Sequence, residues 1–390
     1  MEWFFLTLKN PLRHPLRSVL TIAGIAIAIL SFSLIRTVIA AWYSGVEAAA
    51  PNRLISRHAT SIVFPLPVAY KESIRAIPGV TGVSYANWFG GIYIDERHSQ
   101  FPQFAVDAAS WFDLYPEMIV APETKEAFLR ERNAVIVGRK LAGQQGWKVG
   151  DTIRMRGTIY PGEWDFVIRG VYAGAQRSTD ETWLLFHWRY LDERLRQVEP
   201  FRAGYVGWYT IRIGDPSRAG EIGEAIDRRF KNSLAETLTE TERAFQMEFV
   251  SMSDAILSAL EVVSMVIIGV ILAVLSNTMA MAARERLSEY AVLKTLGFGG
   301  RHLVFMIVGE SLLIAAAGGA LGIFLAYPVA SIFAKLFADL AGALFPVFEV
   351  PAATVAACIL ITLVVGVGAA LFPAWRAVQI KIVEGLRRVG

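Results

Sequence analysis

Four long apolar stretches constrain the fold of this chain more than any other feature. They cover residues 19–42, 251–283, 303–326 and 350–375, and the fourth carries no charged side chain. A helix needs about 20 consecutive, mostly apolar residues to cross the hydrocarbon core of a bilayer. Each stretch is long enough to do so. The sequence therefore predicts an α-helical membrane protein with four transmembrane helices.

Charged residues are concentrated between the first two stretches. Of the 208 residues from Tyr43 to Val250, 51 are Asp, Glu, Lys or Arg, whereas the other 182 residues carry 22. A charged fraction near one quarter is usual for a soluble domain. We therefore expect a water-soluble domain at 43–250. It must fold without an internal disulfide, because the only cysteine, Cys358, lies in an apolar run.

The distribution of Lys and Arg predicts the orientation, because short loops rich in these residues stay in the cytoplasm. The loop at 327–349 has Lys335 as its only cation and is expected to be a short periplasmic loop. The 284–302 loop and both termini are expected inside, which places the domain at 43–250 outside the cytoplasm. The cations behind this assignment are Lys9, Arg13, Arg17, Arg284, Arg286, Lys294, Arg301, Arg376, Lys381, Arg387 and Arg388.

The two terminal segments have different expected structures. Residues 1–18 begin with Trp-Phe-Phe-Leu at positions 3–6, and these are followed by Lys9. This composition favours a short helix that lies in the membrane interface. We therefore expect a cytoplasmic interfacial helix at 1–18 and a cytoplasmic tail at 376–390.

Two charged residues lie within the predicted spans. Arg36 is close enough to the outer end of the first span for its guanidinium to reach the interface, which explains it better than a buried functional charge does. Glu310 lies about two turns into the third span, where a functional role and a structural hydrogen bond are both open. Neither residue indicates a proton or ion path.

The soluble domain begins and ends with a βα pattern. At its start we expect a strand at Ser61–Phe64, a helix at Val68–Ile77 and one or two strands at Val80–Ile94. Near its end, Tyr205–Ile213 alternates like a strand and Arg218–Phe230 has helical periodicity. Two such units on one sheet predict a porter-like part with a ferredoxin-like layer. The whole domain is therefore expected to be α+β and extracytoplasmic.

The middle of this domain, at about 104–188, is expected to be an inserted β-rich subdomain. Strands are predicted at Ala134–Val137, Thr152–Met155 and Phe166–Tyr172, with a short helix at Lys140–Gln145. After the second βα unit, 234–283 has no proline and Gly269 as its only glycine. That run predicts a continuous helical stalk that enters the second span.

No catalytic constellation is present in the sequence. The five histidines are not spaced like metal ligands, and the chain has no Gly-Lys pair, which a phosphate-binding P-loop requires. We therefore expect no catalytic, metal-binding or cofactor-binding residue in this chain, and a non-enzymatic function. Energy from ATP would have to come from another polypeptide.

Three segments carry a resemblance to a known family. They are 16–28, 284–297 with the following Glu310-Ser311, and 372–380 with 383–387. The sequence resembles the permease subunits of the MacB/FtsX family of ABC transporters, the mechanotransmission type also called type VII. The most specific segment is 284–297, which reads Arg-Glu-Arg-Leu-Ser-Glu-Tyr-Ala-Val-Leu-Lys-Thr-Leu-Gly.

The resemblance implies a bacterial inner-membrane permease with a MacB-like periplasmic domain and stalks at 43–250. Two permeases, as a homodimer or heterodimer, would pair with two copies of an ATPase that binds ATP and Mg. The ATPase is expected to be a separate subunit, because the chain begins almost at its first span. The complex would export or extract an amphiphile, such as a lipid, lipoprotein, peptide or drug, with a periplasmic adaptor. The alternative is an FtsX-like signal transmitter that activates an extracytoplasmic hydrolase.

The resemblance also implies a role for the 284–302 loop as the coupling helix that faces the ATPase. An ordinary solvated loop would need cations inside the cell, but it would not need Glu285 and Glu289. An acidic face is better explained as a docking surface. The expected coupling residues are Arg284, Glu285, Arg286, Glu289, Tyr290 and Lys294, with Gly297 as the C-terminal stop of the helix.

Overall fold

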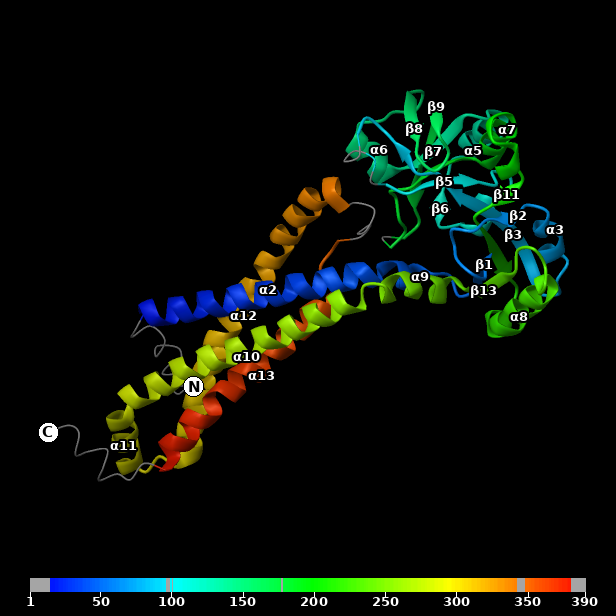
Figure 1. The fold of residues 1–390 in the computed structure, drawn as a ribbon. Helices are drawn as coiled ribbons and strands as arrows, with labels where there is room; N and C mark the ends of the chain where they lie inside the picture. The colour runs from blue at the N-terminus through cyan, green and yellow to red at the C-terminus, as the bar shows by residue number, and fades with distance from the viewer. Residues whose placement is uncertain (1–14, 96–98, 100, 177, 342–347, 380–390) are drawn as a thin grey trace. The chain divides into compact units, whose positions relative to one another are not determined.

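A computed structural model describes residues 15–95, 99, 101–176, 178–341 and 348–379 of the chain (Figure 1). The interfacial helix expected at 1–18 lies almost entirely outside the described residues, and so does most of the tail. The chain forms two compact units. The helical unit comprises 1–40, 254–334 and 348–390, and the sheet unit comprises 41–253 and 335–347.

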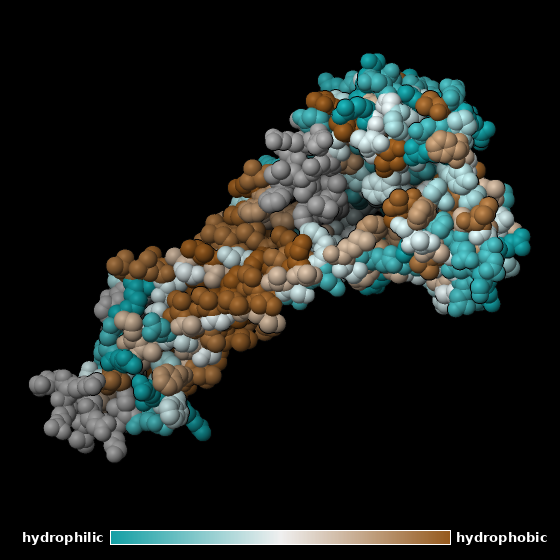
Figure 2. Space-filling model, viewed as in Figure 1, coloured by the Kyte–Doolittle hydropathy of each residue, from teal (hydrophilic) through white to brown (hydrophobic). Residues whose placement is uncertain are grey.

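The helical unit contains four helices that are long and apolar enough to cross a membrane, as the sequence predicts. In the most apolar stretch of each helix, only a sixth to a third of the residues are buried inside the protein. Most apolar side chains of these helices therefore face outward. Figure 2 shows this apolar surface along the long helices. The helices of this unit are α2 (Pro15–Ala48), α10 (Asp254–Glu285), α11 (Leu287–Thr295), α12 (Gly300–Ala341) and α13 (Ala352–Gln379).

Glycines allow these helices to pack closely. A Cβ on Gly322 of α12 would lie 2.7 Å from the Ala26 carbonyl oxygen of α2, and one on Gly319 would lie 2.5 Å from Thr362 Oγ1 of α13. Close approach of backbones is the usual use of small residues between helices in membranes. The core of the helical unit therefore depends on small side chains as well as large ones.

Helix α12 is longer than the sequence predicts. The third span was expected to end at Ala326, but α12 continues through Pro328 to Ala341. The first part of the loop expected at 327–349 is therefore helical. A proline removes one backbone hydrogen bond, but within an apolar helix this break is tolerated when other groups satisfy the freed carbonyls.

The sheet unit is built on one 11-stranded sheet, whose main path runs β13-β1-β12-β3-β5-β10-β7-β9-β8-β4. β6 pairs with β9, and β2 and β11 form a separate pair. The strands are β1 (Arg53–His58), β2 (Leu66–Pro67), β3 (Val80–Trp88), β4 (Gly91–Ile92), β5 (Gln103–Val106), β6 (Met118–Ile119), β7 (Ala134–Gly138), β8 (Thr152–Gly157), β9 (Gly162–Gly174), β10 (Leu184–His187), β11 (Tyr205–Val206), β12 (Trp208–Ile213) and β13 (Thr237–Thr241).

The first four strands along that path form the predicted ferredoxin-like layer. The units β1-α3-β3 and β12-α8-β13 contribute them, and all neighbours on this part of the path are antiparallel. The buried Ile74 of α3 and Ile222, Ile226 and Phe230 of α8 pack in one core cluster. The short helices of the sheet unit are α3 (Tyr70–Arg75), α4 (Trp111–Leu114), α5 (Pro122–Arg130), α6 (Arg139–Gln145), α7 (Trp188–Val198), α8 (Ala219–Phe230) and α9 (Glu242–Ser251), with 3-10 turns at Pro200–Arg202 and Pro216–Arg218.

The inserted part extends the same sheet. β3 pairs with β5 in antiparallel register from Ala86 to Trp88, and the strands from β5 to β10 in the chain lie beyond that pairing. The parallel pairs β5/β10 and β7/β9 lie within the inserted part. The predicted strands at 134–137, 152–155 and 166–172 and the helix at 140–145 are present with small shifts of their ends.

Two predictions in the sheet unit are wrong. The first strand is Arg53–His58, whereas 61–64 is a turn in which Val63 and Phe64 are exposed. The predicted continuous stalk from 234 is divided into β13, α9 and α10, with a turn at Met252–Ser253. Alternating threonines in 237–241 favour a strand. The absence of glycine and proline did not make this segment helical.

Candidate functional site

The short helix α11 lies between the membrane-spanning helices α10 and α12 and forms the centre of the candidate site. Its C-terminal end is a Schellman motif, in which Phe298 N donates to the Leu293 carbonyl and Gly297 N donates to the Lys294 carbonyl, both at 3.1 Å. Gly297 has a φ of 91°, a conformation that favours glycine. Gly297 thus occupies the stop position that the sequence predicts.

A buried ion pair holds the start of α11 to α12. Arg286, just before α11, donates from Nη1 to Glu310 Oε2 at 2.7 Å, and both side chains are less than a tenth exposed. Breaking such a pair leaves an uncompensated buried charge. Arg286 therefore does not belong to the exposed face on which the sequence placed it. Of the two roles open for Glu310, this contact supports the structural one.

Two further residues of the expected coupling set attach α11 to the helical unit. Tyr290 is 4% exposed and belongs to the unit's core cluster, and burial raises the pKa of its hydroxyl to about 12. Lys294 Nζ donates to the Val378 carbonyl oxygen of α13 at 2.7 Å. Tyr290 is therefore an anchor inside the unit and does not form part of a docking surface.

The remaining coupling residues are exposed. Arg284, Glu285, Glu289 and Gly297 all lie on the surface of the helical unit. Glu285 also receives two hydrogen bonds from Arg17 at the start of α2, at 2.6 and 2.8 Å. The sequence marked Arg17 only as an inside cation and gave no signal for this pairing.

Arg36 is the other intramembrane residue singled out by the sequence. It lies on α2 and is partly buried. It belongs to the helical unit but not to the set of residues that hold α11. Its predicted interfacial position stays a prediction.

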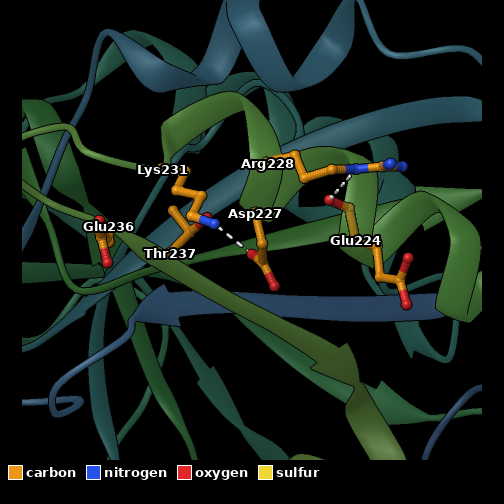
Figure 3. A pocket seen from close by; sticks show the side chains of 6 residues that line it. All are labelled: Glu224, Asp227, Arg228, Lys231, Glu236 and Thr237. Carbon is orange, nitrogen blue, oxygen red and sulfur yellow. Dashed lines mark hydrogen bonds between the residues drawn. The ribbon is translucent and has the colours of Figure 1, made fainter.

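A polar pocket in the sheet unit is a second place to consider (Figure 3). It has a volume of about 360 Å³ beside α8 and β13. Asp227 accepts hydrogen bonds from Thr237 Oγ1, Thr239 Oγ1 and Thr239 N at 2.7 to 3.0 Å. Its carboxylate is therefore bonded to the edge strand β13 and helps to protect that edge. The lining residues are Glu224, Asp227, Arg228, Lys231, Glu236 and Thr237. We assign this pocket a structural role.

The fold and the α11 region define a class of protein: a multi-pass membrane protein with four span-capable helices and an α+β domain. The model of the MacB-like periplasmic core domain matches residues 18–229, and that of the FtsX-like permease C-terminal region matches 261–382. The chain belongs to the MacB-like and FtsX-like permease family of ABC transporters.

Curated relatives agree with this assignment. The chain is 28% identical over 189 residues to the macrolide export ATP-binding/permease protein MacB of Shewanella oneidensis, over 47% of this chain and 27% of that protein. It thus spans about a quarter of the length of that exporter. It is also 23% identical over 405 residues to an uncharacterized ABC transporter permease of Methanocaldococcus jannaschii, over 97% of this chain and 96% of that one.

Solved structures of related domains resemble parts of the chain weakly. The periplasmic region of MacB from Actinobacillus actinomycetemcomitans matches with a TM-score of 0.38 and 8% identity, over 52% of this chain and 95% of that one. The extracellular domain of the noncanonic ABC-type transporter YknZ from Gram-positive bacteria matches with a TM-score of 0.34 and 11% identity, over 49% and 100%. The family assignment rests on the sequence matches.

Proposed function

We propose that this chain is the membrane subunit through which a separate ATPase drives an extracytoplasmic domain. In this proposal the sheet unit lies outside the cytoplasm and α11 lies inside, where two ATPase subunits bind ATP and Mg. Two permease copies form the membrane core. The chain itself performs no chemistry, and its 390 residues lack the Gly-Lys pair of a P-loop.

The observation that carries the proposal is the way α11 is held. Three contacts tie its surroundings to different helices: Arg286 to α12, Lys294 to α13, and Glu285, at the end of α10, to α2. A force applied to α11 would therefore reach the spans together. The exposed Arg284 and Glu289 supply charges of both signs for a partner surface, and complementary charges of this kind favour specific docking.

The substrate is proposed to be an amphiphile, such as a lipid, lipoprotein, peptide or drug, which is exported or extracted from the membrane or the periplasm. The size of the sheet unit, whose main part covers 41–253, favours this function over simple signalling. A periplasmic adaptor would complete the path. The alternative is an FtsX-like transmitter that activates an extracytoplasmic hydrolase. The two can be separated by whether an adaptor or a hydrolase co-purifies with the complex.

Charge reversal at α11 tests the proposal. We expect Glu289→Lys to abolish ATP hydrolysis stimulated by this subunit in a reconstituted complex, because it reverses the charge on the docking face, while membrane insertion stays normal. Glu224→Lys, at an exposed glutamate of the sheet unit, is the matched control and should leave hydrolysis unchanged. Unchanged hydrolysis in Glu289→Lys would contradict the assignment of α11 as the coupling helix.

A further inference from the structure

Helix α9 packs on one face of β1 through a register of alternating charged and apolar contacts. Arg53, Ile55 and Arg57 share that face, because side chains two apart in a strand point the same way. Arg53 pairs with Glu242 of α9 at 2.8 Å, and Arg57 pairs with Glu248 at 2.7 Å. Between them, Phe245 of α9 packs against the core cluster that contains Ile55.

Arg53 is the most enclosed charge in this register. It is 3% exposed, and its guanidinium lies 4.0 Å from the centre of the Tyr115 ring. Nη1 donates to the Leu114 carbonyl oxygen at 2.8 Å, and Nη2 donates to Glu117 at 2.7 Å. Every nitrogen of this side chain is therefore bonded to a fixed partner.

Arg53 and its partners connect three different parts of the sheet unit. Glu242 is the first residue of α9, and its Oε2 also accepts a hydrogen bond from Ala50 N, two residues beyond the end of α2, at 2.9 Å. Leu114 and Glu117 belong to the inserted part: Leu114 is the last residue of α4, and Glu117 immediately precedes β6. One side chain thus joins the segment that follows α2, the start of α9 and the insertion.

The last turns of α2 also contact α9 directly. A Cβ on Gly45 would lie 3.3 Å from Gln246 Oε1, so a larger residue at position 45 must push the Gln246 side chain against the rest of α9 or turn it aside. α2 begins in the helical unit, and α9 ends three residues before α10 begins there. These two helices are therefore the covalent routes by which movement of the spans can enter residues 41–253 of the sheet unit.

A buried arginine with several carboxylate partners resists sliding. Removing one partner of a buried pair is strongly destabilising, because it leaves a charge without compensation. The contact set of Arg53 is therefore maintained when α9 moves, and the insertion is expected to follow. An apolar contact of similar size would allow the two surfaces to shift past each other at little cost.

We propose that Arg53 is a positioning residue that transmits displacement of α2 and α9 to the inserted part of the sheet unit. The inference rests on the proposed function only for the source of that displacement. The tie itself is a property of the sheet unit. It can be tested with the full chain in detergent or nanodiscs without any ATPase.

The first experiment uses Gly45→Leu to crowd α9 at Gln246 and reads hydrogen exchange in α9 and at 114–119. We expect exchange there to rise about threefold or more in the otherwise unchanged chain, because local opening responds to loss of packing. The uncoupled variant carries Arg53→Met, Glu117→Gln and Glu242→Gln, which leave no unpaired charge. In that background Gly45→Leu should raise exchange in α9 but not at 114–119.

Two further variants separate coupling from general destabilisation. Arg53→Lys keeps the charge and should retain part of the response at 114–119. Arg169→Met removes the Arg169–Glu131 pair, which lies wholly within the inserted part, and should leave the response intact. The inference would be overturned if Gly45→Leu still raised exchange at 114–119 in the uncoupled variant while that variant kept the unfolding temperature of the native chain.

The second experiment adds the ATPase and compares exchange with and without a trapped nucleotide. We expect nucleotide to change exchange at 114–119 in the native complex and not in the uncoupled variant, although that variant still binds the ATPase. If the first experiment succeeds and nucleotide changes nothing in the native complex, then the proposed function fails and the Arg53 tie stands. If nucleotide still changes 114–119 in the uncoupled variant, the tie is refuted.

Discussion

At the scale of single residues, the informative charges of this chain are the buried ones. Arg53 and Arg286 each look like an ordinary surface arginine in the sequence, one at the start of a polar segment and one in a cationic loop. Their carboxylate partners, Glu242 and Glu310, are distant in the chain. Such pairs depend on tertiary contacts, so no local pattern could identify them. The exposure of Arg284 and Glu289 could be predicted from the sequence, because a short charged loop between two transmembrane helices lies outside the bilayer.

The Arg286–Glu310 pair gives a test of stability. We expect Arg286→Leu to destabilise the helical unit by about 3–5 kcal/mol, because Glu310 loses its ion-pair partner in a buried site. The double variant Arg286→Leu with Glu310→Leu should recover most of that loss. Thermal or denaturant unfolding in detergent measures both. A single variant as stable as the native chain would show that the pair does not anchor α11.

His187 gives a test by pH. It is 3% exposed, and burial lowers the pKa of its imidazole from 6.5, with Arg132 and Arg189 lowering it further. The unfolded chain therefore binds a proton more readily than the folded chain, so the stabilising contribution is present above pH 6.5 and is lost as pH falls below it. We expect tryptophan fluorescence to show a lower unfolding temperature at pH 5.5 than at pH 7.5. His187→Gln should reduce this difference, and an unchanged difference would exclude His187 as its source.

At the scale of elements, signals confined to one segment predicted well and signals that depend on pairing did not. The apolar spans, α8 and β7 were predicted because each carries its own periodicity or length. β1 was missed because Arg53 and Arg57 occupy its buried face, where an apolar pattern was expected. β13 was read as part of a helix because the absence of glycine and proline was given more weight than its alternating threonines, and its pairing with β1 is not visible in the sequence. Helix α12 continues beyond the third span predicted from the sequence, because Pro328 does not end the helix.

Packing between α2 and α12 gives a prediction at this scale. We expect Gly322→Leu to lower the unfolding temperature of the helical unit by several degrees, because its Cβ alone would lie 2.7 Å from the Ala26 carbonyl oxygen. Gly269→Ala on α10 is the control, since a Cβ there meets no heavy atom within 4 Å. Equal stability of the two variants would argue against close packing of α2 on α12.

At the scale of the whole molecule, the proposed function requires two units with different roles. In the helical unit, contacts to several spans hold α11. In the sheet unit, the segment after α2 and the start of α9 meet at Arg53 and its partners. Continuous chain joins the helical unit to residues 41–253 of the sheet unit through α2 and through the short turn between α9 and α10. The proposal that force crosses the membrane has meaning only if α11 and the sheet unit lie on opposite sides of it.

The most direct test of this claim is labelling of single cysteines in intact cells. In a Cys358→Ala background, Leu234→Cys reports on the sheet unit and Leu296→Cys on the end of α11, and both positions are well exposed. A membrane-impermeant maleimide should label position 234 in intact spheroplasts and position 296 only after lysis. Labelling of position 234 only after lysis, or of position 296 without it, would contradict the account.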